Sequence, residues 1–283
     1  MVPALGEETG IWTPQRPCGE AGSIRGAGCE DGPHDEKSNE MNTTERSVQL
    51  NSGREIRILE SREVRLTPYS LFLLEHLPCP SPDAVVIDYG VGTGLQAIAL
   101  ALAGAGRVLG VDINKEALAL CRANCEQNQA AVELCLGREE MRGKVAPASV
   151  DLIVCNPASL PAQEQNLSPF FQAGEEGNAM ILELIAVAEQ TLKPGGRLLF
   201  IHTSLVPLAD TLARLEQSGF AAGIVRIRAL AFRDFYFKLL PHWRNLLARG
   251  RSFYLVRQGQ YYEILYLIEA QKIGPTKGGP YSL

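Results

Sequence analysis

The sequence lacks the features that mark membrane-spanning and secreted proteins. Its 283 residues contain no run of about 18 apolar residues, the length that a transmembrane helix requires. Residues 1–10 have neither a basic region nor an apolar core, so no secretory signal is predicted. We therefore expect a cytoplasmic protein without a membrane partner.

Cysteine occurs in no pattern that predicts a disulfide framework or a metal site. The seven cysteines are an odd number, and no two of them form a Cys-x-x-Cys pair. They also lack zinc-type spacing with the four histidines. The pattern predicts reduced cysteines used as small apolar residues, with Cys121 and Cys125 one helical turn apart on a packing face, and no metal.

An excess of charge of one sign is also missing. The formal net charge is −5, 21% of the residues are charged and 46% are hydrophobic. This composition is typical of a globular protein with one large α/β core, and the bulk charge does not favour a polyanion partner.

The first part of the chain has little hydrophobic periodicity. Residues 1–45 are rich in Gly, Pro, Glu and Ser, so they bury too little apolar surface to offset the entropy of ordering. We expect a disordered N-terminal extension over 1–45 and one domain over 46–283. Met41 is an alternative start, and the sequence leaves open whether residues 1–40 belong to the native protein.

Strands and helices are predicted to alternate along most of the domain. Residues 46–82 are expected to form substrate-side elements: two short strands or a hairpin around Ile56, Ile58, Val64 and Leu66, then a helix from Thr67. The apolar runs that follow predict strands over 84–88, 107–112, 131–136, 150–155, 197–202, 222–231 and 261–270. Helices are expected over 95–103, 115–127, 180–192 and 206–218.

This order predicts a Rossmann-like α/β fold. Its seven-stranded sheet should be mostly parallel and covered by helices on both faces. A C-terminal helical insertion is expected over 232–260, before the last strand, with a helix around 242–248.

A glycine-rich stretch follows the first strand of this alternation. Asp88-Tyr89 leads into Gly90-Val91-Gly92-Thr93-Gly94, and a helix is expected at once. The spacing is Gly-x-Gly-x-Gly, whereas a dinucleotide site has its third glycine one position later, where this chain has Leu95. Asp88 would repel a pyrophosphate and suits an ammonium group. The loop therefore favours S-adenosylmethionine over NAD, with Asp88, Gly90, Gly92, Thr93 and Gly94 as binding residues.

Three further residues complete the predicted cofactor site. Asp112 ends the second strand, where a carboxylate accepts hydrogen bonds from ribose hydroxyls. Ile113 follows it, and Gly137 comes after the third strand, near the expected adenine position. Asn114 is the better candidate for the N-cap of the next helix.

The fourth strand ends in Asn156-Pro157-Ala158-Ser159, and here the sequence resembles a known family. Together with residues 86–94, 110–114 and 192–196, this stretch looks like the "methyltransferase small" group of class I S-adenosylmethionine-dependent methyltransferases. The likeness covers about residues 64–219. Residues 173–178 also resemble a stretch of the release-factor glutamine methyltransferases, and the group includes N-methyltransferases of RNA.

The resemblance implies catalytic roles for Asn156 and Pro157, in a degenerate Asn-Pro-Pro-Tyr motif. An amide or amino nitrogen is a poor nucleophile, and an Asn oxygen with the next backbone carbonyl can accept both of its N–H bonds and orient it. Asn156 would then also border the cofactor. Ala158 and Ser159 replace the second proline and the aromatic, so a substrate-stacking ring would have to come from Tyr69, Phe170, Phe171 or the tail.

The stretch from Arg226 to Arg257 is strongly basic. It contains eight Arg and Lys residues and one acid, Asp234, with aromatic residues between them. Such a segment suits RNA or another anionic partner, or else forms a lid that packs on the sheet. We expect a methyltransferase acting on an amide or amino nitrogen of a protein or RNA. A small-metabolite acceptor, a noncatalytic binding protein and the oligomeric state stay open.

Overall fold

The central strands are continuous apolar runs that bury both of their faces. In β3 (Val85–Tyr89), Val86 and Ile87 are buried in two different hydrophobic clusters. Leu199 and Phe200 of β7 (Leu192–Thr203) divide between the same two clusters. Because neighbouring side chains point to opposite faces, such strands require cover on both sides of the sheet.

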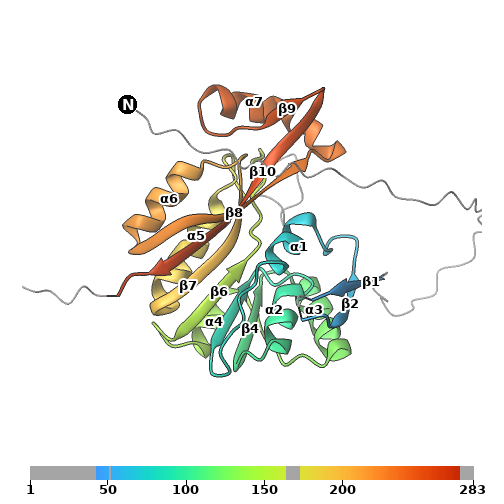
Figure 1. The fold of residues 1–283 in the computed structure, drawn as a ribbon, viewed down its shortest axis with the longest axis vertical. Helices are drawn as coiled ribbons and strands as arrows, with labels where there is room; N and C mark the ends of the chain where they lie inside the picture. Colours follow the sequence, from blue (N-terminus) through green and yellow to red (C-terminus); the bar gives the residue numbers. More distant parts are fainter. Residues whose placement is uncertain (1–42, 51, 164–172, 275–283) are drawn as a thin grey trace, which may run out of the picture. The chain divides into compact units, whose positions relative to one another are not determined.

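The computed structural model describes residues 43–50, 52–163 and 173–274, and its main sheet has the predicted plan (Figure 1). The strand order is β5-β4-β3-β6-β7-β10-β8, and the short β9 pairs with β10, so the described sheet has eight strands where seven were predicted. The strands from β5 to β7 are parallel, and β10 runs antiparallel to β7, β8 and β9. The remaining strands are β4 (Arg107–Asp112), β5 (Glu133–Leu136), β6 (Val150–Cys155), β8 (Phe220–Ala231), β9 (Leu255–Arg257) and β10 (Gln260–Lys272).

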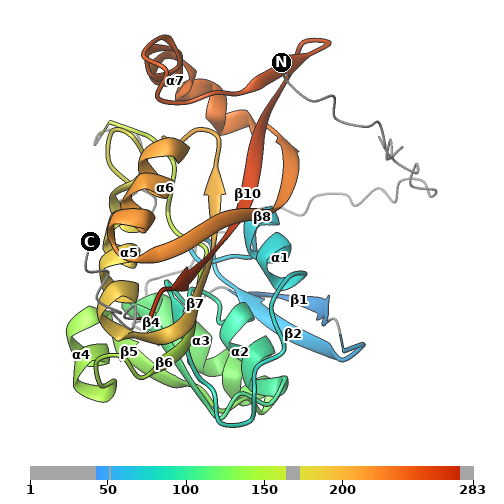
Figure 2. The ribbon, with the colours of Figure 1, turned by 60° about the vertical axis from the view of Figure 1, so that its left-hand side comes forward.

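Helices cover each face of the sheet in two separate layers (Figures 1 and 2). One layer contains α1 (Pro68–Leu74), α2 (Leu95–Leu102) and α3 (Lys115–Asn128). The other contains α4 (Gly137–Lys144), α5 (Ala179–Thr191) and α6 (Leu208–Gln217). The predicted Rossmann-like class is therefore confirmed, with one unpredicted helix: α4 buries only Met141, so its sequence has no apolar period.

The small N-terminal hairpin differs from its prediction. Strand β2 (Glu55–Glu60) contains Ile56 and Ile58 as expected, but its partner is β1 (Thr44–Gln49). Val64 and Leu66 are buried in irregular chain, so the predicted second strand was wrong. Residues 1–42 lie outside the described residues, and so does most of the predicted extension.

The predicted insertion before the last strand forms a small core of its own. It contains the 3₁₀ helix η2 (Asp234–Lys238), α7 (Leu240–Ala248) and β9, and Figure 1 shows α7 beyond the end of the sheet. The hydrophobic cluster around α7 is separate from the two sheet clusters. Its buried members are Leu160, Ala162, Leu205, Phe232, Tyr236, Leu239, Leu240, Trp243 and Leu246.

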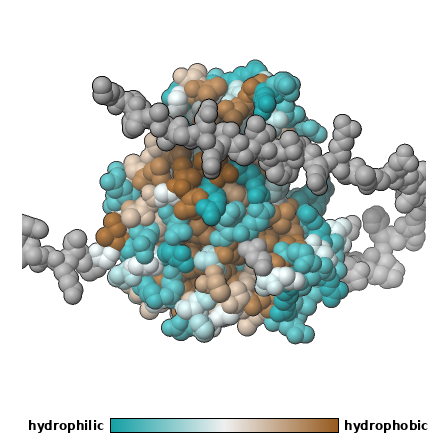
Figure 3. All heavy atoms as spheres, viewed as in Figure 1, coloured by the Kyte–Doolittle hydropathy of each residue, from teal (hydrophilic) through white to brown (hydrophobic). Residues whose placement is uncertain are grey.

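The edge strand β8 keeps apolar side chains in solvent. Ile224, Val225 and Ile227 are exposed, Ile227 to 64%. In Figure 3 apolar surface gathers where β8 and β10 lie in the same view. All described elements belong to one compact unit, Met41–Leu283, and none of the described helices is long and apolar enough to cross a membrane.

Candidate active site

Three parallel strands end beside one another at one edge of the sheet. Asp88 of β3 pairs with Gly110 of β4 and with Val154 of β6. The residues that follow these strands therefore emerge together, and ligands of open α/β sheets bind at this carboxyl edge. The structure brings together the glycine loop (Gly90–Gly94), Asp112 and the Asn-Pro loop (Asn156–Gln163).

Close packing from both sides makes glycine necessary in the glycine loop. Gly90 and Gly94 have φ of +80° and +86°, which strains other residues. A Cβ on Gly94 would lie 2.7 Å from Cys121 Sγ, and one on Gly90 would lie 2.8 Å from Met180 Cε. The predicted packing face of α3 is thus confirmed for Cys121, whose buried side chain packs against Gly94 of the loop.

Asp112 ties the end of β4 to this loop. One carboxylate oxygen accepts from the Gly92 amide at 3.0 Å, and the other accepts from the Asn114 amide at 2.9 Å. Asn114 caps α3 through the Glu116 amide at 2.9 Å, as predicted. Burial raises the pKa of Asp112 above its ordinary value, so the carboxylate is short of the hydration that stabilises its charge.

A solvent-exposed apolar side chain, Ile113, follows Asp112. Ile113 is 77% exposed, which is unusual for a large aliphatic side chain beside a buried strand. Gly137, with φ of +72°, lies next to it: a Cβ there would be 3.8 Å from Ile113 Cγ2. These two residues, predicted from separate strand ends, therefore face the same space.

Asp88 lies beneath the glycine loop and is only 2% exposed. Its carboxylate accepts from the Ala97 amide at 3.0 Å and so caps α2, whose N-cap Gly94 has no side chain. Burial, reinforced by the charge of Asp112, holds the pKa of Asp88 well above its usual range. Thr93 is also buried, and its carbonyl accepts from Asn124 Nδ2 at 2.8 Å. Contacts of Asp88 and Thr93 with a cofactor stay predictions.

The Asn-Pro loop begins with a half-buried Asn156 and a buried Pro157. The Ala158 amide donates to Met180 Sδ at 3.2 Å, a bond that the second proline of the related motif could not make. Met180, near the start of α5, also contacts Gly90 and thus joins the two loops. Met180 was not predicted as a site residue. The apolar pattern of α5 predicts a helix, but it does not show that one helix residue contacts both the glycine loop and the Asn-Pro loop.

Ser159, which stands where the related motif has an aromatic residue, does not face solvent. Ser159 is only 7% exposed, and a Cβ on Gly177 would lie 2.9 Å from its carbonyl oxygen. Tyr69, one proposed replacement, is buried and donates its hydroxyl hydrogen bond to Glu263. Phe170 and Phe171 lie outside the described residues.

Basic side chains of the insertion form ion pairs within the protein. Arg251 makes a bidentate bond to Glu176 at 2.7 Å and contacts Asp210 of α6 at 2.5 Å. Arg249 lies 3.6 Å from Glu175. Both glutamates belong to the acidic turn (Ala173–Asn178), so these two arginines are paired within the protein, and the insertion packs in its own cluster rather than on the two cores of the sheet.

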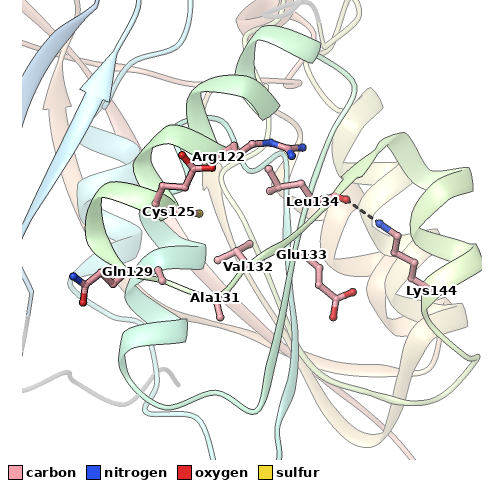
Figure 4. Close-up of a pocket in the computed structure, with 10 residues that line it drawn as sticks. Arg122, Cys125, Gln129, Ala131, Val132, Glu133, Leu134 and Lys144 are labelled. Carbon is pink, nitrogen blue, oxygen red and sulfur yellow. Dashed lines mark hydrogen bonds between the residues drawn. The ribbon is translucent and has the colours of Figure 1, made fainter.

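A hollow of about 510 Å³ lies between α3 and β5 (Figure 4). Arg122, Cys125, Glu133 and Lys144 are among the residues that line it. It adjoins the beginning of β5, whereas the loops described above follow strand ends, so it is not part of this site. Within the described ranges, no group of three His, Cys, Asp or Glu residues is placed to hold a metal ion.

Comparisons with known proteins show the family to which the chain belongs. The model of the methyltransferase small domain matches residues 64–219. A candidate protein N5-glutamine methyltransferase of Methanocaldococcus jannaschii is 32% identical over 182 residues, covering 62% of this chain and 88% of that protein. A release factor glutamine methyltransferase of Haemophilus influenzae is 33% identical over 149 residues, covering 46% of this chain and only 49% of that protein.

Solved structures show the same fold. The YcgJ protein of Bacillus subtilis superposes with a TM-score of 0.52 at 15% identity, covering 72% of this chain and 97% of that one. A 16S rRNA N2 G1207 methyltransferase of T. thermophilus, solved with AdoMet and guanosine, has a TM-score of 0.50 at 19% identity, covering 81% and 50%. At these identities the likeness bears on the fold alone. Since the matched domain spans more than half of the chain, including the glycine loop, Asp112 and the Asn-Pro loop, the chain belongs to the methyltransferase small domain family and is a methyltransferase with a Rossmann-like fold.

Proposed function

We propose that this protein transfers the methyl group of S-adenosylmethionine to the side-chain amide nitrogen of a glutamine in a protein. The observation that carries the proposal is the position of Asn156-Pro157. The pair leaves β6 next to β3, and Met180 joins the next residue, Ala158, to Gly90 of the glycine loop. An acceptor nitrogen held there lies beside the predicted cofactor site.

The charges at the glycine loop suit S-adenosylmethionine. Asp112 lies at the loop as a hydrogen-bond acceptor, and the acidic Asp88 lies beneath it, so an ammonium or hydroxyl group is a better neighbour here than a phosphate. S-adenosylmethionine brings an ammonium, a sulfonium and ribose hydroxyls, whereas a dinucleotide brings an anionic pyrophosphate. The charge pattern therefore supports the methyl donor.

Each part of the donor has a matching group in the chain. Asp112 would accept from the ribose hydroxyls, and Ile113 with Gly137 would form the apolar wall for adenine. The glycine loop, with Gly90, Gly92, Thr93 and Gly94, would enclose the methionine end above Asp88. When bound, S-adenosylmethionine supplies an electrophilic methyl group.

The Asn-Pro loop supplies orientation for the acceptor. The lone pair of an amide nitrogen is delocalised into the carbonyl group, so the nitrogen is a weak nucleophile. The side-chain oxygen of Asn156 and the carbonyl of Pro157 would accept its two N–H bonds and direct the lone pair towards the methyl group. One proton then leaves the nitrogen, and water is an adequate acceptor for it.

A protein acceptor has more support than RNA. The relatives found by sequence are named as methyltransferases of protein glutamine or of ribosomal protein L11. In addition, Arg249 and Arg251 are neutralised by the acidic turn and α6, which removes two of the cations on which an RNA interface would depend.

The test uses the purified protein, S-adenosylmethionine tritiated on its methyl group, and a cell lysate separated into protein, RNA and small molecules. We expect label in the protein fraction. Acid hydrolysis of N5-methylglutamine breaks the amide and releases tritiated methylammonium, which becomes volatile methylamine when alkali is added, whereas methyl groups on lysine or arginine stay with the amino acid. Label in RNA or small molecules alone, or protein label that hydrolysis does not release as methylamine, would refute the glutamine assignment.

A further inference from the structure

The Asn-Pro loop packs away from the two cores of the sheet. Leu160 and Ala162 are buried in the cluster of the insertion, together with Trp243 and Leu246 of α7. The residues that follow Asn156 are therefore supported by a segment about 80 positions later in the sequence.

A buried hydrogen bond fixes this contact. The indole N–H of Trp243 donates to the carbonyl of Pro161 at 2.8 Å, and Trp243 is fully buried. Pro161 has no backbone N–H, so this carbonyl is its one strong hydrogen-bonding group. An unsatisfied carbonyl at a buried position is costly, so the bond selects one position of the loop relative to α7.

A second contact reaches the loop through the acidic turn. Gly177 lies directly against the loop, since a Cβ there would be 2.9 Å from Pro161 N and from Ser159 O. The Ala162 amide donates to the carbonyl of Gly174 at 3.2 Å. Arg251 holds the same turn through its bidentate bond to Glu176.

We propose that Trp243 of α7 and Arg251, which follows α7, position the Asn-Pro loop for methyl transfer. Together they hold the loop so that Asn156 keeps one orientation. This role rests on the proposed function of Asn156. The loop has Ala158 where the related motif has a second, stiff proline, and the insertion supplies the rigidity from outside. Trp243 and Arg251 are positioning residues, since neither is argued to touch substrate.

Hydrogen exchange of the uncomplexed protein tests this positioning without any methyl acceptor. Trp243→Phe removes the N–H and keeps most of the apolar ring, and Arg251→Gln removes the bidentate bond. In each variant the peptide over 156–163 should exchange about threefold to tenfold faster, the factor that one lost hydrogen bond implies. A peptide over β4 should be unchanged.

The matched control is Arg228→Gln. Arg228 also makes a bidentate bond, to Glu75 of the segment after α1, but it contacts neither the loop nor the acidic turn. This variant should leave the exchange of 156–163 at the wild-type rate. It should also leave methyl transfer to lysate proteins unchanged.

Kinetics separate positioning from simple destabilisation. At saturating S-adenosylmethionine, Trp243→Phe and Arg251→Gln should lower the initial rate of methyl transfer about fivefold or more, while the Kd for S-adenosylmethionine stays as in the wild type. The cofactor site depends on the glycine loop and Asp112, which neither substitution touches.

Each outcome decides one proposal. Unchanged exchange over 156–163 in both variants would overturn the positioning role, as would equal acceleration over 156–163 and β4. If Trp243→Phe fails to fold, Arg251→Gln with its Arg228→Gln control carries the same test. A wild-type protein that labels no protein fraction would refute the proposed function, whereas the exchange result would still decide whether α7 holds the loop.

Discussion

The carboxylate of Asp112 accepts a hydrogen bond from the Gly92 amide at 3.0 Å. One residue therefore faces the predicted ribose position and also fixes the middle of the glycine loop. This bond explains why a strand end and a loop separated by 20 residues hold a fixed position relative to each other.

Asp112→Ala should weaken the binding of S-adenosylmethionine by about 1.5–3 kcal/mol, because charge-assisted bonds to the ribose are lost and the Gly92 amide loses its partner. Calorimetry measures the change. Asp112→Asn keeps an oxygen for Gly92 and should show an intermediate loss. Binding of S-adenosylmethionine to Asp112→Ala at wild-type affinity would contradict the assignment, and preferential binding of NAD by the wild type would refute the cofactor itself.

Asn156→Ala should lower turnover by about 10²-fold or more, because the pair of acceptors that orients the nitrogen is incomplete. The Kd for S-adenosylmethionine should be nearly unchanged, since Asn156 is expected only to border the cofactor, whose main contacts are expected at the glycine loop and Asp112. Tritium transfer to lysate proteins and calorimetry provide the two measurements. Full turnover in this variant would leave the family and the fold intact and remove the proposed role of the Asn-Pro pair.

Gly94→Ala should destabilise the protein by about 2–4 kcal/mol, from a strained positive φ and from overpacking against Cys121. Denaturant unfolding measures the loss. The double variant Gly94→Ala with Cys121→Ala removes the contact at 2.7 Å but keeps the strain, so it should be more stable than Gly94→Ala alone. No recovery would show that the packing of Cys121 under the loop is not what excludes a side chain.

His202 should make stability depend on pH. It is buried in β7 within 3.0 Å of the Thr211 hydroxyl, and burial lowers its pKa to about 4. Above about pH 6.5 the imidazole is neutral in both the folded and the unfolded chain, and below it only the unfolded chain takes up the proton. Stability should therefore fall as the pH drops from about 6.5 to 4, by about 3 kcal/mol from this residue.

Denaturant unfolding at pH 7 and at pH 4.5 measures this loss. Carboxylates titrate over part of the same range, so the informative quantity is the difference between the wild type and His202→Gln. That variant should lose less free energy of unfolding on acidification. Equal losses in the two proteins would show that His202 is not the group responsible.

A chain that begins at Met41 should unfold at the same temperature and bind S-adenosylmethionine with the same affinity as the full chain, because residues 1–40 have the composition of a disordered extension. A chain that begins at Leu50 lacks β1 and its pairing with β2, so it should be less stable. A loss of more than about 5 °C in the Met41 chain, roughly 2 kcal/mol for a domain of this size, would contradict the expected boundary.

The sequence predicted the central sheet because its strands are buried on both faces. Val86-Ile87 and Leu199-Phe200 can be read as strands without knowing their neighbours, and repetition along the chain implies parallel pairing. The same logic located the glycine loop, Asp112 and Asn156, since parallel strand ends meet at one edge. These assignments needed only local order.

Long-range contacts were beyond this reasoning. The bond of Trp243 to Pro161 and the pairing of Arg251 with Glu176 join segments 75 or more positions apart. The basic residues looked like a surface for an anionic partner, because a charge pattern does not show where the balancing acids lie. Helix α4 and strand β1 were missed for a simpler reason: α4 buries one residue and β1 only Val48.

The position of β10 has a consequence for the order in which the protein is completed during synthesis. Among the described strands β10 comes last in the sequence, yet it lies between β7 and β8, and it is the partner through which β8 joins the described sheet. While a ribosome is still making the insertion, the cofactor half of the sheet can assemble from contacts close in sequence, as such contacts form fastest. The Asn-Pro loop gains the support of Trp243 and Arg251 only after the insertion has been made. A chain that ends before the insertion is thus expected to form the glycine loop and its bond to Asp112 before the Asn-Pro loop is held in place.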